Sequence, residues 1–167
     1  MTGVQTCALP ICPLALAELL DSVVQDARFE AQLEQRNILL RIENEAQVLA
    51  DPTLLRSAIE NVVRNALRHT PAESLVEVLL SRHESEVSID ICDQGPGVPE
   101  DDLLRLFDPF TRLDEARGHG DGFGLGLAIS ARAMQAHAGR IRAANRPEGG
   151  LCVTLSLPLM ADSSSSV

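Results

Sequence analysis

The spacing of apolar residues along this chain changes repeatedly between two periods. The pattern predicts four helices, over residues 14–35, 52–70, 99–106 and 124–137. In the first two, apolar residues recur at three- and four-residue steps, which is typical of a helix with one buried face. Asp51 and Pro52 support the start of the second helix, because Asp caps a helix N-terminus and Pro fits the first turn.

Other segments alternate apolar and polar residues, as half-buried β-strands do. We expect strands over residues 37–44, 75–82, 86–93, 140–146 and 151–157. The polar turn His83-Glu84-Ser85 separates the second and third of these strands, so they are predicted to form a hairpin. Interleaved helices and strands in a chain of 167 residues predict one α/β domain.

The two ends of the chain show neither pattern. We interpret residues 1–13 as a leader that is non-native or disordered. The serine-rich residues 161–167 are expected to form a disordered tail. The folded domain is therefore predicted to span residues 14–160.

Charge and cysteine content narrow the classes of function. The chain has 24 acidic and 14 basic residues and a formal net charge of −10, which argues against nucleic acid or an anionic membrane as the main partner. No apolar stretch approaches the ~18 residues that cross a bilayer. Cys92 and Cys152 lie in apolar, strand-like segments, where we predict buried free thiols of a reducing compartment. A polyphosphate site would need a local cluster of basic residues, and the candidates are Arg64, Arg68, Arg112 and Arg117.

Two asparagines in the second predicted helix are candidates for a metal site. Asn61 and Asn65 lie four residues apart, so they share one face beside the apolar stripe. The uncharged amide oxygen of Asn suits a Mg²⁺ ion that takes its other ligands from water and phosphates. Arg68 and His69 continue this surface one turn later and could reach phosphate or base. Without further context, the two amides fit a solvated helix surface equally well.

A carboxylate followed by glycines marks the end of one predicted strand. Asp93 ends the strand, and Gly95, Pro96 and Gly97 follow. Such a carboxylate can accept a hydrogen bond from an exocyclic amine, as adenine presents, and the glycines let the backbone approach the base. Taken alone, the segment fits a common Asp-Gly turn better.

Residues 122–127, with the sequence GFGLGL, place three alternating glycines at the start of a predicted helix. Free backbone N–H groups at a helix N-terminus favour phosphate, although flexible loops also use this glycine spacing. The glycines precede a late helix, which excludes a Rossmann motif, and the chain contains no Walker A motif. The aperiodic, glycine-rich residues 108–123 are expected to form a mobile loop.

In this order the segments resemble the ATP-binding catalytic domain of sensor histidine kinases, in the superfamily that includes gyrase B, Hsp90 and MutL. The similar segments are residues 60–69 (N box), 93–97 (G1 box), 107–110 (F box) and 122–127 (G2 box). Residues 110–117 and the N box look closest to envelope-stress kinases of the Cpx type. The resemblance covers residues 14–160 and implies the Bergerat-type ATP-binding fold, a two-layer α/β sandwich whose mixed sheet has three main helices on one face.

The resemblance also implies roles for individual residues. Asn65 would ligate Mg²⁺, Asp93 would bind the adenine amine, and residues 108–123 would form a lid over ATP. Asn61 and Arg112 are the implied catalytic residues. The residues implied to bind the nucleotide are Asn61, Asn65, Arg68, His69, Asp93, Gly95, Gly97, Val98, Phe110, Gly122, Gly124, Leu125, Gly126 and Leu127.

The implied function is transfer of the γ-phosphoryl group of ATP to a histidine on a separate dimerisation domain. None of the 4 histidines has the sequence context of a phosphoacceptor, so we expect that domain to be absent from this chain. The resemblance further implies a response regulator as partner and a cytoplasmic location, as part of an inner-membrane sensor. The fragment itself is expected to be monomeric and not inserted in a membrane.

Two departures from the family pattern affect the expected site. Asp121 stands where the family often has Gly, and Leu151 follows Gly150 where relatives often have a Thr or Ser that supports the base. Two other functions remain open: an ATP-binding module without turnover, and an ATPase switch of the same superfamily. In the hydrolysing relatives a Glu at the position of Asn61 activates water, and an amide is a poor general base, which argues against the ATPase switch.

Overall fold

The computed structural model describes residues 10–111 and 125–160. The predicted tail and most of the predicted leader and lid lie outside these residues.

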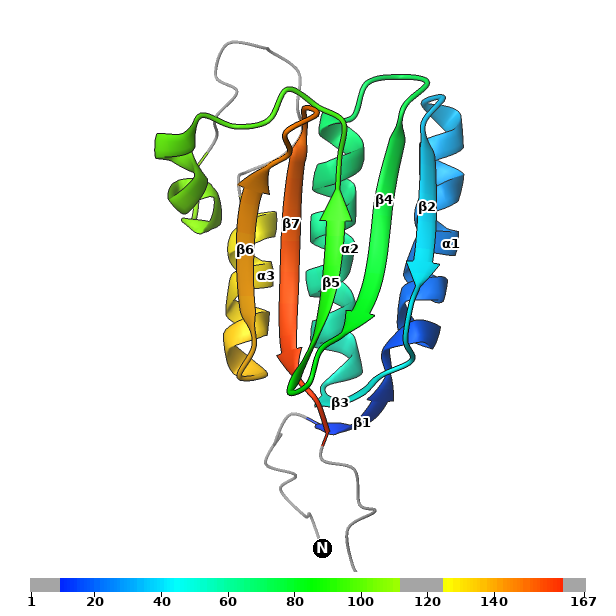
Figure 1. Cartoon of the computed structure of the whole chain (residues 1–167), viewed down its shortest axis with the longest axis vertical. Helices are drawn as coiled ribbons and strands as arrows, with labels where there is room; N and C mark the ends of the chain where they lie inside the picture. The colour runs from blue at the N-terminus through cyan, green and yellow to red at the C-terminus, as the bar shows by residue number, and fades with distance from the viewer. Residues whose placement is uncertain (1–9, 112–124, 161–167) are drawn as a thin grey trace, which may run out of the picture.

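A five-stranded mixed sheet forms one layer of the molecule (Figure 1). Its strands, in spatial order, are β2 (Asn37–Ile42), β4 (Leu75–Arg82), β5 (Glu86–Cys92), β7 (Leu151–Pro158) and β6 (Arg140–Asn145). β2 and β4 run parallel, and all other neighbours run antiparallel. The expected hairpin is formed by β4 and β5, which pair from Arg82 and Val87 next to the turn.

Three helices form the second layer: α1 (Leu16–Leu33), α2 (Pro52–His69) and α3 (Gly126–Ala136). Figure 1 shows all three behind the same face of the sheet. Their apolar faces pack against the alternate apolar residues of the strands. The fully buried side chains of this core include Leu20, Ile59, Ile89, Met134 and Leu155. The predicted two-layer sandwich with three main helices on one face is confirmed.

Two short strands are missed by the sequence pattern. β1 (Cys12–Ala15) pairs antiparallel with β3 (Gln47–Ala50), beyond one end of the main sheet (Figure 1). Each has 4 residues, which is too short for a period to stand out. Cys12 and Pro13 belong to β1, so the strand begins before the predicted domain boundary at residue 14. The short helix expected over residues 99–106 is a 3₁₀ helix, η1 (Glu100–Phe107).

Cys92 and Cys152 are joined by a disulfide, so the prediction of two free buried thiols is wrong. The residues are direct partners in the pairing of β5 with β7, and their Cα atoms are 4.0 Å apart. The next residue pair along the strands is joined by a backbone hydrogen bond from Asp93 N to Leu151 O. Hydrogen-bonded and non-hydrogen-bonded pairs alternate in an antiparallel sheet, so the two cysteines form a non-hydrogen-bonded pair, in which side chains are closest. Alternation along one strand does not reveal its register with another strand.

His137 connects the end of α3 to the start of α2. Asp51 caps α2, as predicted, by accepting hydrogen bonds from the backbone N–H groups of Thr53 and Leu54. The backbone N–H of Asp51 donates to Nε2 of His137 at 3.0 Å, and Nδ1 of His137 lies 2.6 Å from the carbonyl oxygen of Ala133. Both bonds are buried, so the imidazole satisfies two backbone groups that water cannot reach.

We expect His137→Leu to lower the free energy of unfolding by about 1–3 kcal/mol, because it leaves the buried N–H of Asp51 without an acceptor. Urea unfolding followed by circular dichroism measures this change. Gln135→Leu, an exposed position of the same helix, should change stability by less than ~0.5 kcal/mol. Equal losses in the two variants would show that the imidazole bridge contributes nothing.

Candidate functional site

β5 and α2 both terminate at one end of the sheet, and the described segments that carry predicted site residues lie at or next to this end (Figure 1). Gly95 lies against the end of α2: a Cβ on Gly95 would be 2.6 Å from the carbonyl oxygen of His69. The start of α3 lies against the middle of α2, because a Cβ on Gly126 would be 3.7 Å from the side chain of Asn61. Three segments far apart in the sequence therefore meet here.

Asp93 is a buried polar side chain that two backbone N–H groups hold in place. It is buried, with 3% of its surface exposed. Its Oδ1 accepts hydrogen bonds from the backbone N–H of Gly95 at 2.9 Å and of Leu151 at 3.0 Å. Its Oδ2 makes no hydrogen bond to any residue that the structure describes. One carboxylate oxygen thus fixes the side chain, and the other is available as an acceptor.

Leu151 contributes to this arrangement through its backbone. The side chain of Leu151 is buried in the core, whereas its N–H binds the Asp93 carboxylate and its carbonyl accepts from the Asp93 N–H at 2.9 Å. Both contacts with Asp93 are therefore made by the backbone of Leu151 and not by its side chain.

Asn145 holds the segment that follows Asp93. Its Oδ1 accepts from the backbone N–H of Val98 at 2.9 Å, and its Nδ2 donates to the carbonyl of Val98 at 2.6 Å. Gly97 has a φ of +73°, and a Cβ there would lie 2.8 Å from the Asn145 Oδ1. Sequence reasoning missed Asn145; a polar residue at the end of an otherwise apolar and basic strand was the available signal.

Arg146 binds the backbone of Asp93, and the sequence analysis did not identify this residue either. Its Nη1 donates to the carbonyl oxygen of Asp93 at 3.2 Å. Its Nη2 lies 3.4 Å from the carboxylate of Glu77 on β4 and 3.2 Å from that of Glu148. This guanidinium therefore connects β4, β5 and the turn between β6 and β7.

The α2 face presents the two amides as expected. Asn61 and Asn65 are half-buried, and Asn65 makes no hydrogen bond to another described residue. Arg68 is exposed and His69 is half-buried at the last turn of α2. Arg64 was a candidate for the basic cluster, but its Nε lies 3.9 Å from Glu30 of α1. Arg64 is exposed, and this ion pair directs its guanidinium toward α1.

The lid side of the site is only partly described. Arg112, Arg117, Asp121, Gly122 and Gly124 lie outside the described residues. Phe110 has a φ of +64° and is 73% exposed.

Leu125 and Gly126 are half-buried at the start of α3, whereas the side chain of Leu127 is buried in the core. Only the backbone of Leu127 can therefore face a ligand.

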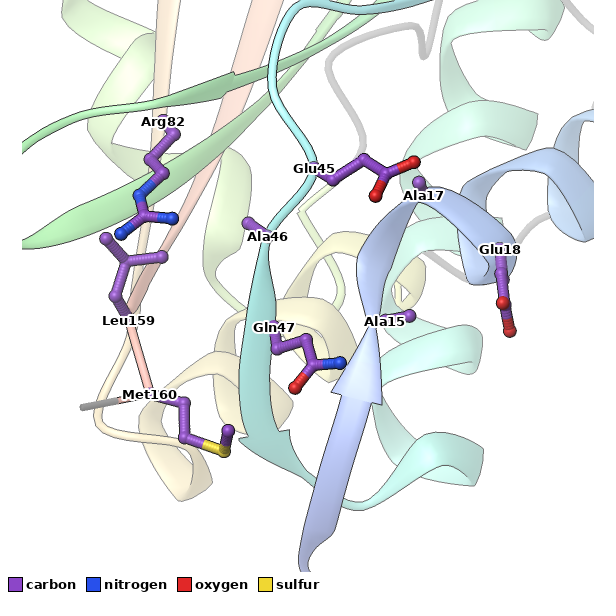
Figure 2. A pocket seen from close by; sticks show the side chains of 9 residues that line it. All are labelled: Ala15, Ala17, Glu18, Glu45, Ala46, Gln47, Arg82, Leu159 and Met160. Atoms are coloured by element: carbon purple, nitrogen blue, oxygen red, sulfur yellow. The ribbon is translucent and has the colours of Figure 1, made fainter. Parts of the chain in front are cut away.

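A separate hollow of about 210 Å³ lies at the opposite end of the sheet (Figure 2). Figure 2 shows it between β1, β3 and the chain after β7, with Arg82, Leu159 and Met160 on one side and Glu18 on another. None of the predicted site residues lines it.

Comparison with known proteins shows which family has this arrangement. The family model described as histidine kinase-, DNA gyrase B- and HSP90-like ATPase matches residues 50–161. The sensor protein PfeS of Pseudomonas aeruginosa is 38% identical over 153 residues, which are 92% of this chain and 34% of PfeS. The sensor histidine kinase CpxA of Escherichia coli K12 is 38% identical over 144 residues, which are 85% of this chain and 31% of CpxA. The chain thus spans about a third of the length of these relatives.

Solved structures have the same fold. The mycobacterial sensor histidine kinase MprB superposes with a TM-score of 0.80 at 26% identity, over 89% of this chain and 97% of that chain. Full-length ShkA in complex with AMPPNP superposes with a TM-score of 0.81 at 26% identity, over 93% of this chain and 32% of that chain.

Among the described residues, no helix combines the length and the hydropathy that a membrane span requires.

Proposed function

The chain belongs to the family of histidine kinase-, DNA gyrase B- and HSP90-like ATPases, and on this premise we propose that it is the ATP-binding, phosphoryl-donor domain of a sensor histidine kinase. The relatives PfeS and CpxA are named as a sensor protein and a sensor histidine kinase, and ShkA was solved with the nucleotide analogue AMPPNP. The proposed reaction transfers the γ-phosphoryl group of ATP to a histidine side chain on another domain.

The burial and hydrogen bonding of Asp93 are the observation that carries this proposal. A buried carboxylate with one oxygen held by two backbone N–H groups presents its other oxygen in a fixed direction. The exocyclic amine of adenine is a donor that matches this acceptor, and a charged acceptor in a partly dry site makes a strong hydrogen bond. Gly95 and Gly97 let the backbone after Asp93 pass close to the end of α2 and to Asn145, which keeps this segment beside the carboxylate.

The phosphates would lie between α2 and the start of α3. The first N–H groups of α3 have no partner within the helix, and α3 is 11 residues long, so its N-terminus favours an anion. Gly126 lies against Asn61, which brings this N-terminus beside the first of the two amides. Arg68 and His69 follow on the same helix, and we propose Arg112 as a further phosphate contact and catalytic residue.

Asn65 is the proposed Mg²⁺ ligand. Its amide oxygen is half-buried and unpaired among the described residues, and these residues contain no cluster of three His, Cys, Asp or Glu that could enclose an ion. Such a site fits an ion that takes its remaining ligands from phosphates and water. When bound, Mg²⁺ would neutralise charge on the phosphates during transfer.

The phosphoryl acceptor and the partner proteins are inferred from the kinase family to which this chain belongs. We propose a dimerisation domain with a phosphoacceptor histidine, a response regulator downstream, and a cytoplasmic location for this domain. Asn61 suits such a donor, because an amide does not activate water well and ATP would stay intact until the histidine arrives.

Radiolabelled γ-phosphate distinguishes the three candidate functions. The chain would be mixed with labelled ATP, Mg²⁺ and a separate histidine kinase dimerisation fragment. Acid-labile label on that fragment is the expected result. ATP binding without transfer would support a binding module without turnover, and release of inorganic phosphate without transfer would support an ATPase switch.

We expect Asn65→Ala to remove most of the Mg²⁺-dependent part of ATP affinity, because the only proposed protein oxygen on the ion is lost. Isothermal titration with ATP, with and without Mg²⁺, measures that difference. Gln25→Ala, at an exposed position of α1, is the matched control and should leave the difference unchanged. A full Mg²⁺ effect in Asn65→Ala would refute the metal assignment.

A further inference from the structure

The cysteine pair lies on the face of the sheet that the helices leave open. Ile91 and Val153, which precede Cys92 and follow Cys152, are buried in the core. Side chains alternate along a strand, so both cysteines point to the other face. They are half-buried, and Figure 1 shows no helix in front of this part of β5 and β7. Part of the surface of each cysteine is therefore open to solvent on this face.

The disulfide lies one residue from the groups that hold the Asp93 carboxylate. Asp93 and Leu151 form the residue pair next to Cys92 and Cys152. This neighbouring pair exchanges two hydrogen bonds, from Asp93 N to Leu151 O at 2.9 Å and from Leu151 N to Asp93 Oδ1 at 3.0 Å. Any change in the separation of β5 and β7 at the cysteines acts directly on these two bonds.

We propose that Cys92 and Cys152 form a redox site that controls nucleotide affinity, with the disulfide state binding ATP more tightly than the dithiol state. The inference rests on the proposed function, because it acts through the carboxylate assigned to adenine. In the disulfide state the covalent link holds the ends of β5 and β7 together, and Oδ1 of Asp93 stays bonded to Leu151. Two thiols in contact lie farther apart than two bonded sulfurs. Reduction therefore forces residues 92 and 152 to separate or rotate, and the carboxylate loses part of its fixed orientation.

The redox step uses a low-molecular-weight disulfide, such as oxidised glutathione, as its oxidant. One protein thiolate attacks this disulfide and releases one reduced thiol, which leaves a mixed disulfide on the protein. The second protein thiolate then attacks the protein sulfur of the mixed disulfide and releases the second reduced thiol. Two electrons pass from the protein thiols to the external disulfide, and the two protein protons end on the released thiols. Since reducing compartments keep thiols free, the dithiol would be the resting state there.

ATP titration in the two redox states tests the proposal. Cys7→Ser and Cys12→Ser would be introduced first, so that Cys92 and Cys152 are the only thiols left of the 4 in the sequence. The protein would be prepared with dithiothreitol or with oxidised glutathione, and thiol labelling would verify each state. Isothermal titration with Mg-ATP should give about three- to ten-fold tighter binding for the disulfide state, the effect of roughly one net hydrogen bond.

Cys152→Ser in the same background is the control, because it cannot close the bridge. It should bind ATP with the affinity of the dithiol state under both treatments. Equal affinity in the two states, weaker binding in the disulfide state, or failure of excess oxidised glutathione to close the bridge would each overturn the redox proposal. Absence of ATP binding in both states would overturn the proposed function itself, and the redox proposal with it, and is thus a separate result.

Discussion

Asp93→Asn should weaken ATP binding at least ~30-fold while leaving the fold intact, because a charge-assisted hydrogen bond is lost and a donor faces a donor. The amide oxygen of Asn can still accept the two hydrogen bonds from Gly95 and Leu151 that now end on Oδ1. The other carboxylate oxygen becomes an NH₂ group, which cannot accept from the adenine amine. Isothermal titration measures the affinity, and urea unfolding verifies the fold.

The same substitution should reduce the preference for ATP over GTP, because guanine presents a carbonyl oxygen where adenine presents an amine. Asp90→Asn is the matched control: Asp90 lies on the same strand and its Oδ1 accepts from the hydroxyl of Thr154 at 2.5 Å, on the open face of the sheet. It should leave nucleotide affinity unchanged. Normal ATP affinity in Asp93→Asn would remove the basis of the proposed adenine contact.

Gly150→Ala is expected to lower the free energy of unfolding by about 3 kcal/mol or more, since steric overlap adds to backbone strain. Gly150 has a φ of +103°, and a Cβ there would lie 2.1 Å from the carbonyl oxygen of Asp93. The strand ends that hold Asp93 would have to move apart. Urea unfolding gives the stability, and we expect ATP affinity to fall as well.

Gly149→Ala is the control that separates the cost of backbone strain at positive φ from the cost of steric overlap with Asp93. Gly149 has a similar φ of +100°, but a Cβ there would meet nothing within 4 Å. This variant should therefore lose only about 1–2 kcal/mol, the cost of the backbone conformation alone. If the two alanine variants lost the same stability, the close approach of Gly150 to Asp93 would have no energetic consequence.

Most elements could be predicted because their signals are local. Asp51 and Pro52 start α2 as expected, and the alternation of β4 and β5 around a polar turn gives the hairpin. The strands β1 and β3 could not be predicted in this way, because each is 4 residues long and each gains its order from the other. The same holds for Cys92 and Cys152, which are 60 residues apart in the sequence and direct neighbours across the sheet.

The residues of the candidate site also differ in whether local sequence or only the folded structure identifies them. Helix spacing and a strand end marked Asn61, Asn65 and Asp93 as candidates, and the order of the four boxes along the chain gave them their predicted roles. Asn145 and Arg146 were missed, although they hold the backbone around Asp93 and Val98. Their partners lie about fifty residues away in the chain, and only the pairing of β5, β7 and β6 brings them together.

By itself the sequence determined the longer helices and strands, their order along the chain and the family, because these depend on short-range spacing and on the order of the four boxes. The tertiary structure alone decided the strand register. That register places Leu151 N–H on the Asp93 carboxylate, Arg146 on the Asp93 carbonyl and one cysteine opposite the other. Hydrogen bonds between strands are long-range, so the precise orientation of the carboxylate is a property of the folded sheet.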